Sequence, residues 1–367
     1  MSAIGFPPFR PPVWMKNGHA QTVLGAYLPS PYTTQPVCHR VVLDDGDHLL
    51  CFDDRPNSWK EGDRVALLVH GLCGSSTSGY MNRVAAKLND VGVRTFRKTL
   101  RGFGEGVTTA RRSCHAGLTA DVAAALEHAI SLCPGSPITL VGFSLGANLV
   151  LKLLGELEDL GPAALDSAVA AAPPIDLIHC ARHLRLGLNR LYDWSFIRSL
   201  HALVHERRRS VPDLHDLPLR SLPRRLLEFD DQYTAPLIGY AGATEYYTEA
   251  SSARYLHRIR RRTLIVTAAD DPVIPVEMFD NYEMSDCVTL RVTEHGGHLG
   301  WIGVSGVDPD RRWLDWRIVE WVLALDARQP EAAKTPVQPS NTGSARSPLV
   351  LDPSARPAGG LAPSTSS

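Results

Sequence analysis

The stretch Ile138-Thr-Leu-Val-Gly-Phe-Ser-Leu-Gly146, followed by Ala147-Asn-Leu-Val-Leu-Lys-Leu-Leu154, decides the fold of this chain. A short β-forming run leads directly into a G-x-S-x-G turn, and a helical pattern of apolar residues begins directly after it. This strand–turn–helix arrangement is that of a nucleophile elbow, whose turn is so sharp that the flanking positions must be small. The motif therefore predicts Ser144 as a nucleophile and accounts for Gly142 and Gly146.

Short β-rich runs alternate with helical patterns on both sides of this turn. Several of the runs are nearly continuous apolar stretches, as expected of parallel strands that are buried on both faces. The turn-rich segment Asp44-Asp-Gly-Asp47 separates two of the runs, as in a hairpin. The alternation predicts a mostly parallel, doubly wound α/β sheet. The runs are Arg40–Leu43, His48–Phe52, Val65–Val69, Val93–Phe96, Ile138–Val141, Ala168–Ala171, Thr263–Thr267 and Val288–Val292.

One long stretch interrupts this alternation. Residues 179–249 contain no clear strand pattern, only short segments rich in Leu, Arg, Trp and Tyr, and they lie between the runs Ala168–Ala171 and Thr263–Thr267. We expect an inserted helical lid there, of the kind that excludes water from a site. The tail after residue 325 holds seven prolines and no aromatic residue, so it buries too little to offset the entropy of ordering it. The expected parts are an N-terminal arm packing on the core (1–30), the core (31–178 and 250–325), the lid (179–249) and a disordered tail (326–367).

A nucleophilic serine needs a base, and the base needs an orienting carboxylate. In a fold with this elbow the chain order is Ser, then Asp or Glu, then His. Two loops that follow late strands supply these residue types in that order: Asp270-Asp-Pro-Val-Ile-Pro275 and Thr293-Glu-His-Gly-Gly-His-Leu-Gly300.

Within those loops we expect Asp271 and His298 to be the acid and the base. Asp271 lies four residues before Pro275, a spacing typical of the acid loop, and two glycines before His298 let its backbone approach the serine. The alternative for Asp270 and Asp271 is an ordinary helix N-cap, which would account for one of them. The alternatives for His295 and His298 are an H-x-x-H metal pair or an ordinary loop histidine. The 27 residues from Asp271 to His298 leave room for one helix and one strand.

The segment His70-Gly-Leu-Cys-Gly-Ser-Ser76 directly follows another core strand. An HG turn at this place offers the backbone N–H of Leu72 to a developing oxyanion, opposite the N–H of Leu145. Cys73 lies beside these donors and is a rival nucleophile. No base motif is spaced for Cys73 as well as for Ser144, so we expect the thiol to pack.

Composition and the remaining motifs exclude several classes of function. With 38 basic and 39 acidic residues the net charge is −1, which gives no overall field for binding nucleic acid. The glycine-rich Arg101–Gly106 lacks dinucleotide-binding spacing, and His201 and His205 lack the glutamate of a zinc helix, so we expect neither cofactor nor metal. No stretch is apolar and long enough for a transmembrane segment. The start is no secretory signal, and the seven scattered cysteines predict reduced thiols and a cytoplasmic location.

The chain resembles the YheT-like branch of the α/β-hydrolase fold, which also includes eukaryotic ABHD-type lipid hydrolases. The resemblance covers about residues 6–325 and implies a carboxylic-ester hydrolase with the triad Ser144, Asp271 and His298. Some members of the branch act on phospholipids or medium-chain esters, and a few are alcohol acyltransferases. The motifs that carry the resemblance are Asn17–Thr22, Asp45–Asp47, His70–Ser76, Gly142–Asn148, Phe229–Pro236, Asp270–Pro272 and His295–His298.

We therefore expect a cofactor-independent serine hydrolase that cleaves carboxylic esters, of short- to medium-chain acyl groups or of lipids, through an acyl-enzyme. The partner is then a small-molecule or lipid ester rather than a nucleic acid. One alternative is an alcohol O-acyltransferase, in which an alcohol traps the same acyl-enzyme. Another is a non-enzymatic scaffold with a vestigial site. The sequence leaves the chain length, the head group and the oligomeric state open.

Overall fold

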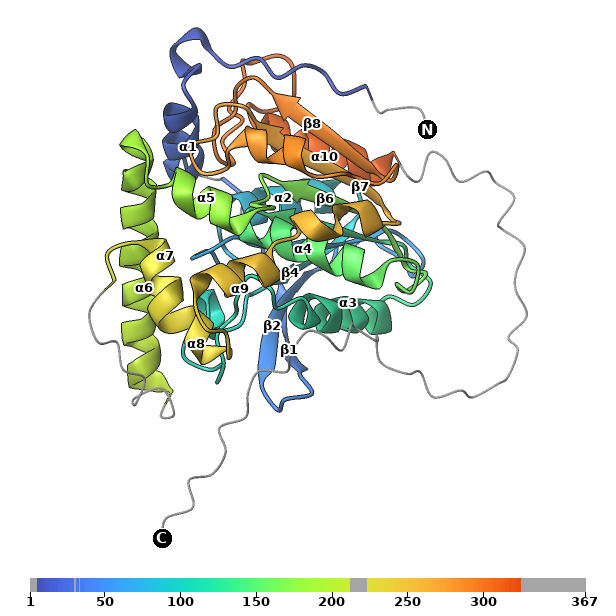
Figure 1. The fold of residues 1–367 in the computed structure, drawn as a ribbon. Helices are drawn as coiled ribbons and strands as arrows, with labels where there is room; N and C mark the ends of the chain where they lie inside the picture. The colour runs from blue at the N-terminus through green and yellow to red at the C-terminus, as the bar shows by residue number, and fades with distance from the viewer. Residues whose placement is uncertain (1–4, 30, 33, 212–222, 325–367) are drawn as a thin grey trace.

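The fold is built on one sheet, in a computed structural model that describes residues 5–29, 31–32, 34–211 and 223–324 (Figure 1). In the described ranges the sheet has eight strands in the order β1-β2-β4-β3-β5-β6-β7-β8. Only the β1–β2 and β2–β4 ladders are antiparallel, so the expected mostly parallel α/β sheet is confirmed. The strands are β1 (Val37–Val42), β2 (His48–Asp54), β3 (Val65–Val69), β4 (Arg94–Lys98), β5 (Ile138–Phe143), β6 (Leu165–Ala171), β7 (Arg262–Ala268) and β8 (Val288–Thr293).

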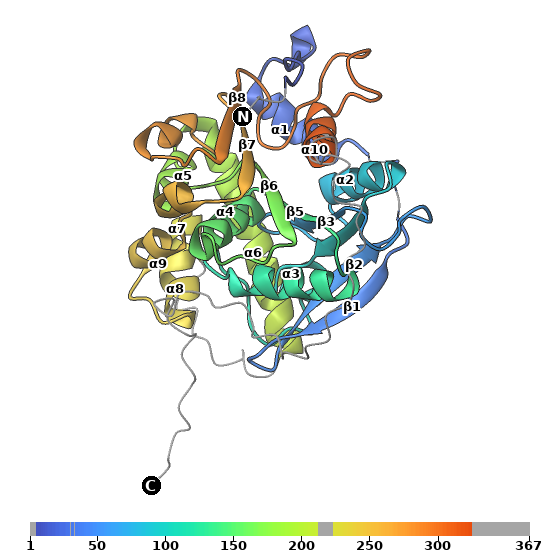
Figure 2. The same ribbon diagram turned by 90° about the vertical axis from the view of Figure 1, so that its right-hand side faces the viewer.

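Helices cover both faces of the sheet, which explains why its central strands are buried on both sides. Every residue of β3 and of β5 is buried. Helices α2 (Gly79–Asp90) and α10 (Trp313–Leu323) pack together on one face, while α3 (Ala120–Leu132) and α4 (Leu145–Leu157) pack on the other (Figure 2). Because helices cover both faces, a site can form only at an edge of the sheet. In folds of this type the loops at the carboxyl ends of the parallel strands form it.

Between β6 and β7 the chain forms a helical insertion, residues 177–211 and 223–250. The expectation of short segments was wrong in one respect, because α6 continues for 21 residues. Ile197, Leu200 and Val204 of this helix are buried, but arginines interrupt its apolar residues in the sequence and obscure the helical period. The expected boundaries at residues 179 and 249 fall inside α5 and α9. The elements are α5 (Leu177–His183), η3 (Gly187–Asn189), α6 (Arg190–Ser210), α7 (Leu226–Phe229), η5 (Asp230–Thr234), α8 (Ala235–Leu237) and α9 (Ala243–Ala250).

The segment between Asp271 and His298 differs from the expectation of a helix and a strand. It contains β8, but its helical part is only a 3₁₀ turn, η7 (Val276–Asn281). Pro272 and Pro275 lack the N–H groups that an α-helix needs, and β8 begins too soon after η7 for a longer helix. The short turn keeps the acid loop close to the sheet.

The expected disordered tail, residues 326–367, lies outside the described residues. Among the residues that are described, no helix combines the length and the apolar character needed to cross a bilayer.

Candidate functional site

Ser144 lies in the turn between β5 and α4, with a backbone φ of +51°. Such an angle is uncommon and strained for a residue with a side chain. The turn brings α4 into direct contact with neighbouring backbone, because a Cβ on Gly146 would lie 2.3 Å from the carbonyl oxygen of Val69, and one on Gly142 would lie 2.5 Å from Ala147 Cα. Glycine at both positions is therefore required, as the motif predicts.

His298 joins Ser144 to Asp271 in one hydrogen-bonded line. The Nε2 atom of His298 lies 3.0 Å from the Ser144 hydroxyl, and Nδ1 lies 2.9 Å from Asp271 Oδ2. Because the carboxylate can only accept, Nδ1 carries a proton and Nε2 is left to accept one from the serine. The three residues come from the loops after β5, β7 and β8, whose carboxyl ends meet at one edge of the sheet.

The Asp271 carboxylate is itself held in place. Its Oδ1 atom accepts hydrogen bonds from the backbone N–H groups of Val273, at 2.8 Å, and Ile274, at 3.0 Å. The side chain of Asp271 is fully buried, and that of His298 is 11% exposed. The acid is therefore fixed by the loop that follows it, and the imidazole is fixed by the acid.

The neighbouring pair Asp270 and His295 forms a separate unit. Asp270 Oδ2 lies 3.3 Å from His295 Nδ1, and its Oδ1 accepts the backbone N–H of Gly297 at 2.8 Å. This pair fixes the histidine loop from the side, and the hydrogen bonds of its side chains go to each other and to this loop rather than to Ser144. The described residues contain no cluster of three or more His, Cys, Asp or Glu side chains suited to a metal ion.

The N-terminal arm also holds the histidine loop. Helix α1 (Gly18–Tyr27) carries Thr22, whose hydroxyl accepts a hydrogen bond from the backbone N–H of His298 at 2.8 Å. The same hydroxyl donates a hydrogen bond to the Gly18 carbonyl. Gln21 donates to the carbonyl of Ile302 and accepts the N–H of the same residue. The arm thus fixes both the histidine and the segment that follows it.

The loop after β3 lies against Ser144, since a Cβ on Gly71 would be 3.0 Å from Ser144 Cβ. His70 fixes this loop: Nδ1 bonds the Gly71 carbonyl at 2.8 Å, and Nε2 accepts the N–H of Leu100 at 3.0 Å. Burial lowers the pKa of His70 to about 4, which keeps the imidazole neutral for this pair of bonds. The Tyr80 hydroxyl accepts the N–H of Gly71.

The predicted oxyanion donors, the backbone N–H groups of Leu72 and Leu145, adjoin the serine from two sides. Within the described part of the chain neither N–H is bonded to a protein acceptor. Next to Leu72, burial raises the pKa of the Cys73 thiol to about 12, so this cysteine is a thiol and not a nucleophilic thiolate near neutral pH. Cys73 packs against the core.

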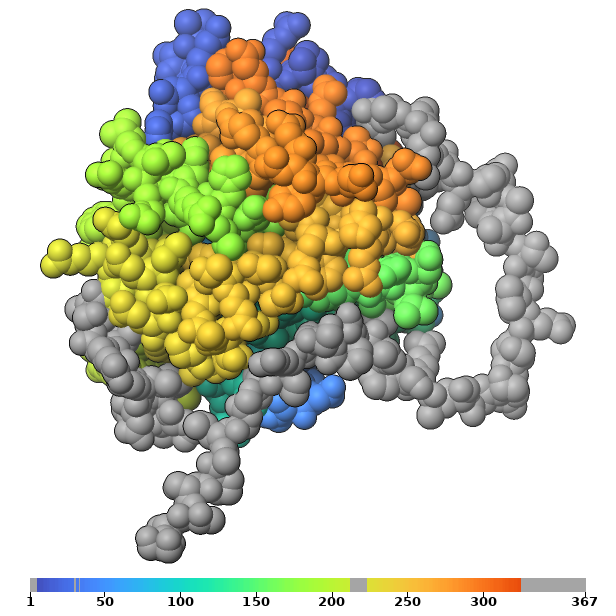
Figure 3. Space-filling model, in the orientation of Figure 1, coloured from blue at the N-terminus to red at the C-terminus, as the bar shows by residue number. Residues whose placement is uncertain are grey.

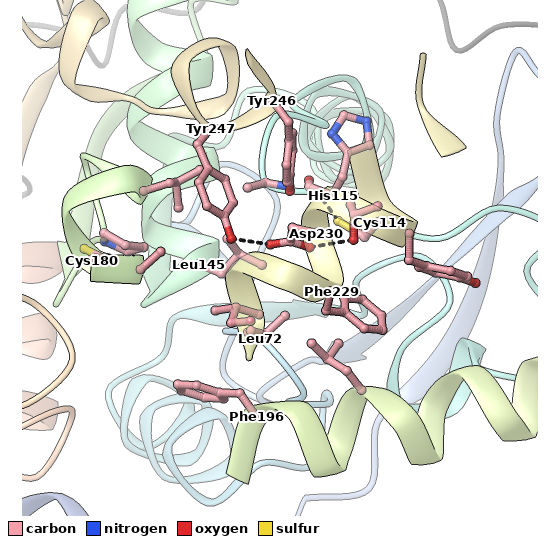
Figure 4. A pocket seen from close by; sticks show the side chains of 18 of the residues that line it. Leu72, Cys114, His115, Leu145, Cys180, Phe196, Phe229, Asp230, Tyr246 and Tyr247 are labelled. Atoms are coloured by element: carbon pink, nitrogen blue, oxygen red, sulfur yellow. Dashed lines mark hydrogen bonds between the residues drawn. The ribbon is translucent and has the colours of Figure 1, made fainter. Parts of the chain in front are cut away.

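A cavity of about 120 Å³ opens beside Ser144 (Figure 4). Its wall includes Leu72 and Leu145, which carry the predicted oxyanion donors, and many residues of the helical insertion. Most of the lining is apolar, as in sites that bind apolar ligand groups. Among the apolar side chains are Leu72, Phe103, Leu177, Phe196, Leu200 and Phe229.

One carboxyl group interrupts this apolar wall. Asp230, in the π-helical turn η5, accepts hydrogen bonds from the hydroxyls of Thr234 at 2.5 Å and Tyr247 at 2.6 Å (Figure 4). Burial raises the pKa of Asp230 to about 6, and the two hydroxyls oppose that rise. Turns of this π type are frequent at functional sites.

Sequence reasoning missed the roles of Thr22, Tyr80 and Asp230. Thr22 and Asp230 lie in two of the motifs that carry the family resemblance, Asn17–Thr22 and Phe229–Pro236, so those motifs were the available signal. Tyr80 carries no such signal. Its contact with Gly71 depends on how α2 packs on the sheet.

Comparison with known proteins identifies relatives over most of the chain. The family model described as alpha/beta hydrolase fold matches residues 65–302. YheT of Escherichia coli (strain K12), provisionally named an esterase, is 32% identical over 326 residues, covering 87% of this chain and 94% of that protein. The phospholipase ABHD3 of Mus musculus is 29% identical over 330 residues, covering 86% of this chain and 78% of its own.

Solved structures show the same fold at lower sequence identity. The esterase Pf2001 of Pyrococcus furiosus superimposes with a TM-score of 0.53 at 16% identity, covering 88% of this chain and 99% of its own. At that identity the likeness concerns the fold alone.

Replacing Asp230 by Asn tests the burial of its carboxyl group through the pH dependence of stability. Because the pKa is raised from 3.8 to about 6, the folded chain keeps a proton that the unfolded chain releases between these pH values. The free energy of unfolding therefore falls by about 3 kcal/mol as the pH rises from about 4 to about 6, and then levels off. Urea unfolding should show this fall in the natural chain relative to Asp230→Asn.

Tyr247→Phe is the companion variant. It removes one hydroxyl that donates to the carboxylate, which raises the pKa of Asp230 further, so the fall should become larger and extend to higher pH. Parallel pH profiles for the natural chain and Asp230→Asn would contradict the assignment.

Proposed function

The chain belongs to the α/β hydrolase fold family and is an ester hydrolase of the YheT-like branch, and on that premise we propose that it cleaves carboxylic esters through an acyl-enzyme on Ser144. One observation carries the proposal: the hydrogen-bonded line from Asp271 through His298 to Ser144, at the wall of an apolar cavity. The three residues act as orienter, base and nucleophile.

Acylation begins when the Ser144 oxygen attacks the ester carbonyl carbon while His298 Nε2 takes the hydroxyl proton. Asp271 stabilises the imidazolium that forms and keeps its ring oriented. The tetrahedral intermediate collapses when the bond to the alcohol oxygen breaks, and His298 returns the proton to that oxygen. The alcohol leaves, and the acyl group stays on Ser144.

The oxyanion of the intermediate is bound by the N–H groups of Leu72 and Leu145. These donors are in place before the reaction, so no reorganisation is needed when charge develops. In a comparable enzyme the loss of one such donor costs about 2.7–4 kcal/mol of transition-state stabilisation. The bonds that His70 and Tyr80 make to Gly71 preserve this arrangement.

Deacylation repeats the chemistry with water as the nucleophile. His298 takes a proton from water, the hydroxide oxygen attacks the acyl carbon, and the proton returns to Ser144 as the acid is released. If ethanol replaced water at this step, the product would be an ethyl ester, so product analysis with added ethanol separates hydrolysis from acyl transfer.

The apolar cavity suits the hydrocarbon part of a short- to medium-chain acyl group or of a lipid ester. The helical insertion supplies much of its wall, which supports the proposal that the insertion is a lid limiting access of water. All seven cysteines are free thiols in the described structure. This supports the proposal that the protein acts in a reducing compartment such as the cytoplasm.

Ser144→Ala should abolish hydrolysis of p-nitrophenyl esters, with a loss in kcat on the order of 10⁶, while leaving the unfolding temperature close to that of the natural chain. The matched variant is Cys73→Ser, which should keep most of the activity because Cys73 only packs beside the site. Loss of activity in Cys73→Ser together with retention in Ser144→Ala would identify the thiol as the nucleophile instead.

The two neighbouring pairs provide a second test. Asp271→Asn and His298→Gln should each lower kcat by several orders of magnitude, about 10⁴ for the acid. Asp270→Asn and His295→Gln should lower it far less, because they act on the loop and not on the serine. Steady-state kinetics of all four variants, each checked by circular dichroism, decides between the pairs. The reverse order in either pair overturns that assignment.

Thr22→Val tests whether the N-terminal arm positions the base. The substitution removes the acceptor of the His298 N–H and should lower kcat by about ten- to a hundredfold with little change in KM, since small misplacements of a reacting group are costly. Thr22→Ser keeps the hydroxyl and should restore most of the activity. Equal activity in the Val and Ser variants would mean that the bond only stabilises the fold.

A further inference from the structure

One surface beside the site is both apolar and basic. It consists of residues 182–198, which run from the end of α5 through η3 into the first part of α6, and four large apolar side chains are exposed in it. Their exposed fractions are 61% for Leu186, 65% for Leu188, 64% for Leu191 and 56% for Trp194. We call this segment the basic–apolar face. Side chains of this size in one short segment are more than the scattered exposure that ordinary surfaces show.

The charge of the basic–apolar face has one sign. Four arginines are exposed in it: Arg182, Arg185, Arg190 and Arg198. Its only acidic residue, Asp193, is buried and accepts the N–H of Leu226. The guanidinium of Arg198 lies 5.5 Å from the ring centre of Trp194. The whole chain has a net charge of −1, so this concentration of positive charge is local.

Helix α1 extends the same surface. His19 stacks on Tyr192 with ring centres 5.7 Å apart, and its Nδ1 lies 3.0 Å from the Tyr192 hydroxyl. Val23 and Tyr27 follow His19 at helical spacing and are 45% and 80% exposed. The N-terminal arm and the start of the insertion adjoin at the surface (Figure 3). The sequence up to Leu43 contains no acidic residue.

This surface adjoins the reacting groups. The hydroxyl of Thr22 in α1 holds the backbone of His298, and Tyr192 lies next to Thr22 and His19. Further along α6, the opposite side of the helix places Phe196 and Leu200 in the cavity wall. One helix therefore carries the exposed Leu and Trp side chains near its beginning and the cavity lining beyond them.

We propose that the basic–apolar face docks on an anionic lipid surface. Trp and Leu side chains that enter the interface, with Arg side chains that reach anionic head groups, are the combination by which helices lie on membranes. The charge of one sign favours an anionic lipid surface over a second copy of this chain, because two such faces would repel each other. Docking would bring the cavity and Ser144 to the source of a lipid ester. The inference rests on the proposed function only for this last consequence, since binding itself needs no catalysis.

Binding is measured by co-sedimentation of the full chain with vesicles of equal parts phosphatidylcholine and phosphatidylglycerol, and with vesicles of phosphatidylcholine alone. We expect the chain to bind the anionic vesicles, and this binding should weaken at high salt. Binding to the neutral vesicles should be at least about tenfold weaker. Leu188→Ser with Trp194→Ser should lower the partition coefficient on anionic vesicles at least about tenfold. Arg182→Gln with Arg185→Gln should lower it and reduce the salt dependence.

Two control variants lie elsewhere on the surface. Leu160→Ser, at a side chain that is 78% exposed, and Arg260→Gln should bind as the natural chain does. Hydrolysis of a water-soluble short-chain ester should be unchanged in all of these variants, because none of the residues lines the cavity. The Ser144→Ala chain should bind vesicles normally, so a failure of the hydrolase assignment is distinguishable from a failure of docking.

Three results would overturn the proposal. One is equal binding by the natural chain and the Leu188/Trp194 variant, and another is binding that does not depend on anionic lipid. The third is a stable dimer of the natural chain that becomes monomeric in the Leu188/Trp194 variant without any vesicle binding, which would assign the face to a second copy.

Discussion

The close contact between the turn at Ser144 and the end of β3 is the constraint on which the rest of the site depends. Glycine at positions 142 and 146 lets α4 begin immediately after β5. The serine hydroxyl and the Leu145 N–H therefore both lie at the carboxyl end of β5. The same approach brings Gly71, and with it Leu72, against the serine. The strained φ of Ser144 is tolerated because buried strands and a buried helix hold the backbone on both sides.

The remaining parts of the site are positioned by segments far away in the sequence. Asp271 and His298 come from the ends of adjacent parallel strands, so their meeting follows from the sheet order. The N-terminal arm adds a contact across 276 residues, from Thr22 to His298. The helical insertion then closes an apolar cavity over the serine. The ends of the sheet strands thus position the residues that we propose as catalytic, and the added segments hold the histidine loop and line the cavity.

The sequence was sufficient for the features that have a local period or a fixed spacing. The eight strands, the turn at Ser144 and the loops with Asp271 and His298 all follow from short patterns, and the structure brings these three residues within hydrogen-bond distance. The 21-residue length of α6 was not predicted, because arginines between its apolar residues obscure the helical period in the sequence. The helix expected after Asp271 is only a 3₁₀ turn because of Pro272 and Pro275. Contacts such as Thr22 to His298 depend on tertiary packing, which no local pattern encodes.

The central claim is that Ser144 forms a covalent acyl-enzyme. The most direct measurement treats the natural chain with a fluorophosphonate probe, digests it and locates the added mass by tandem mass spectrometry. We expect a single adduct on Ser144, which is lost when the protein is unfolded before treatment. No adduct on the folded chain, or an adduct on Cys73 or another residue in place of Ser144, would contradict it.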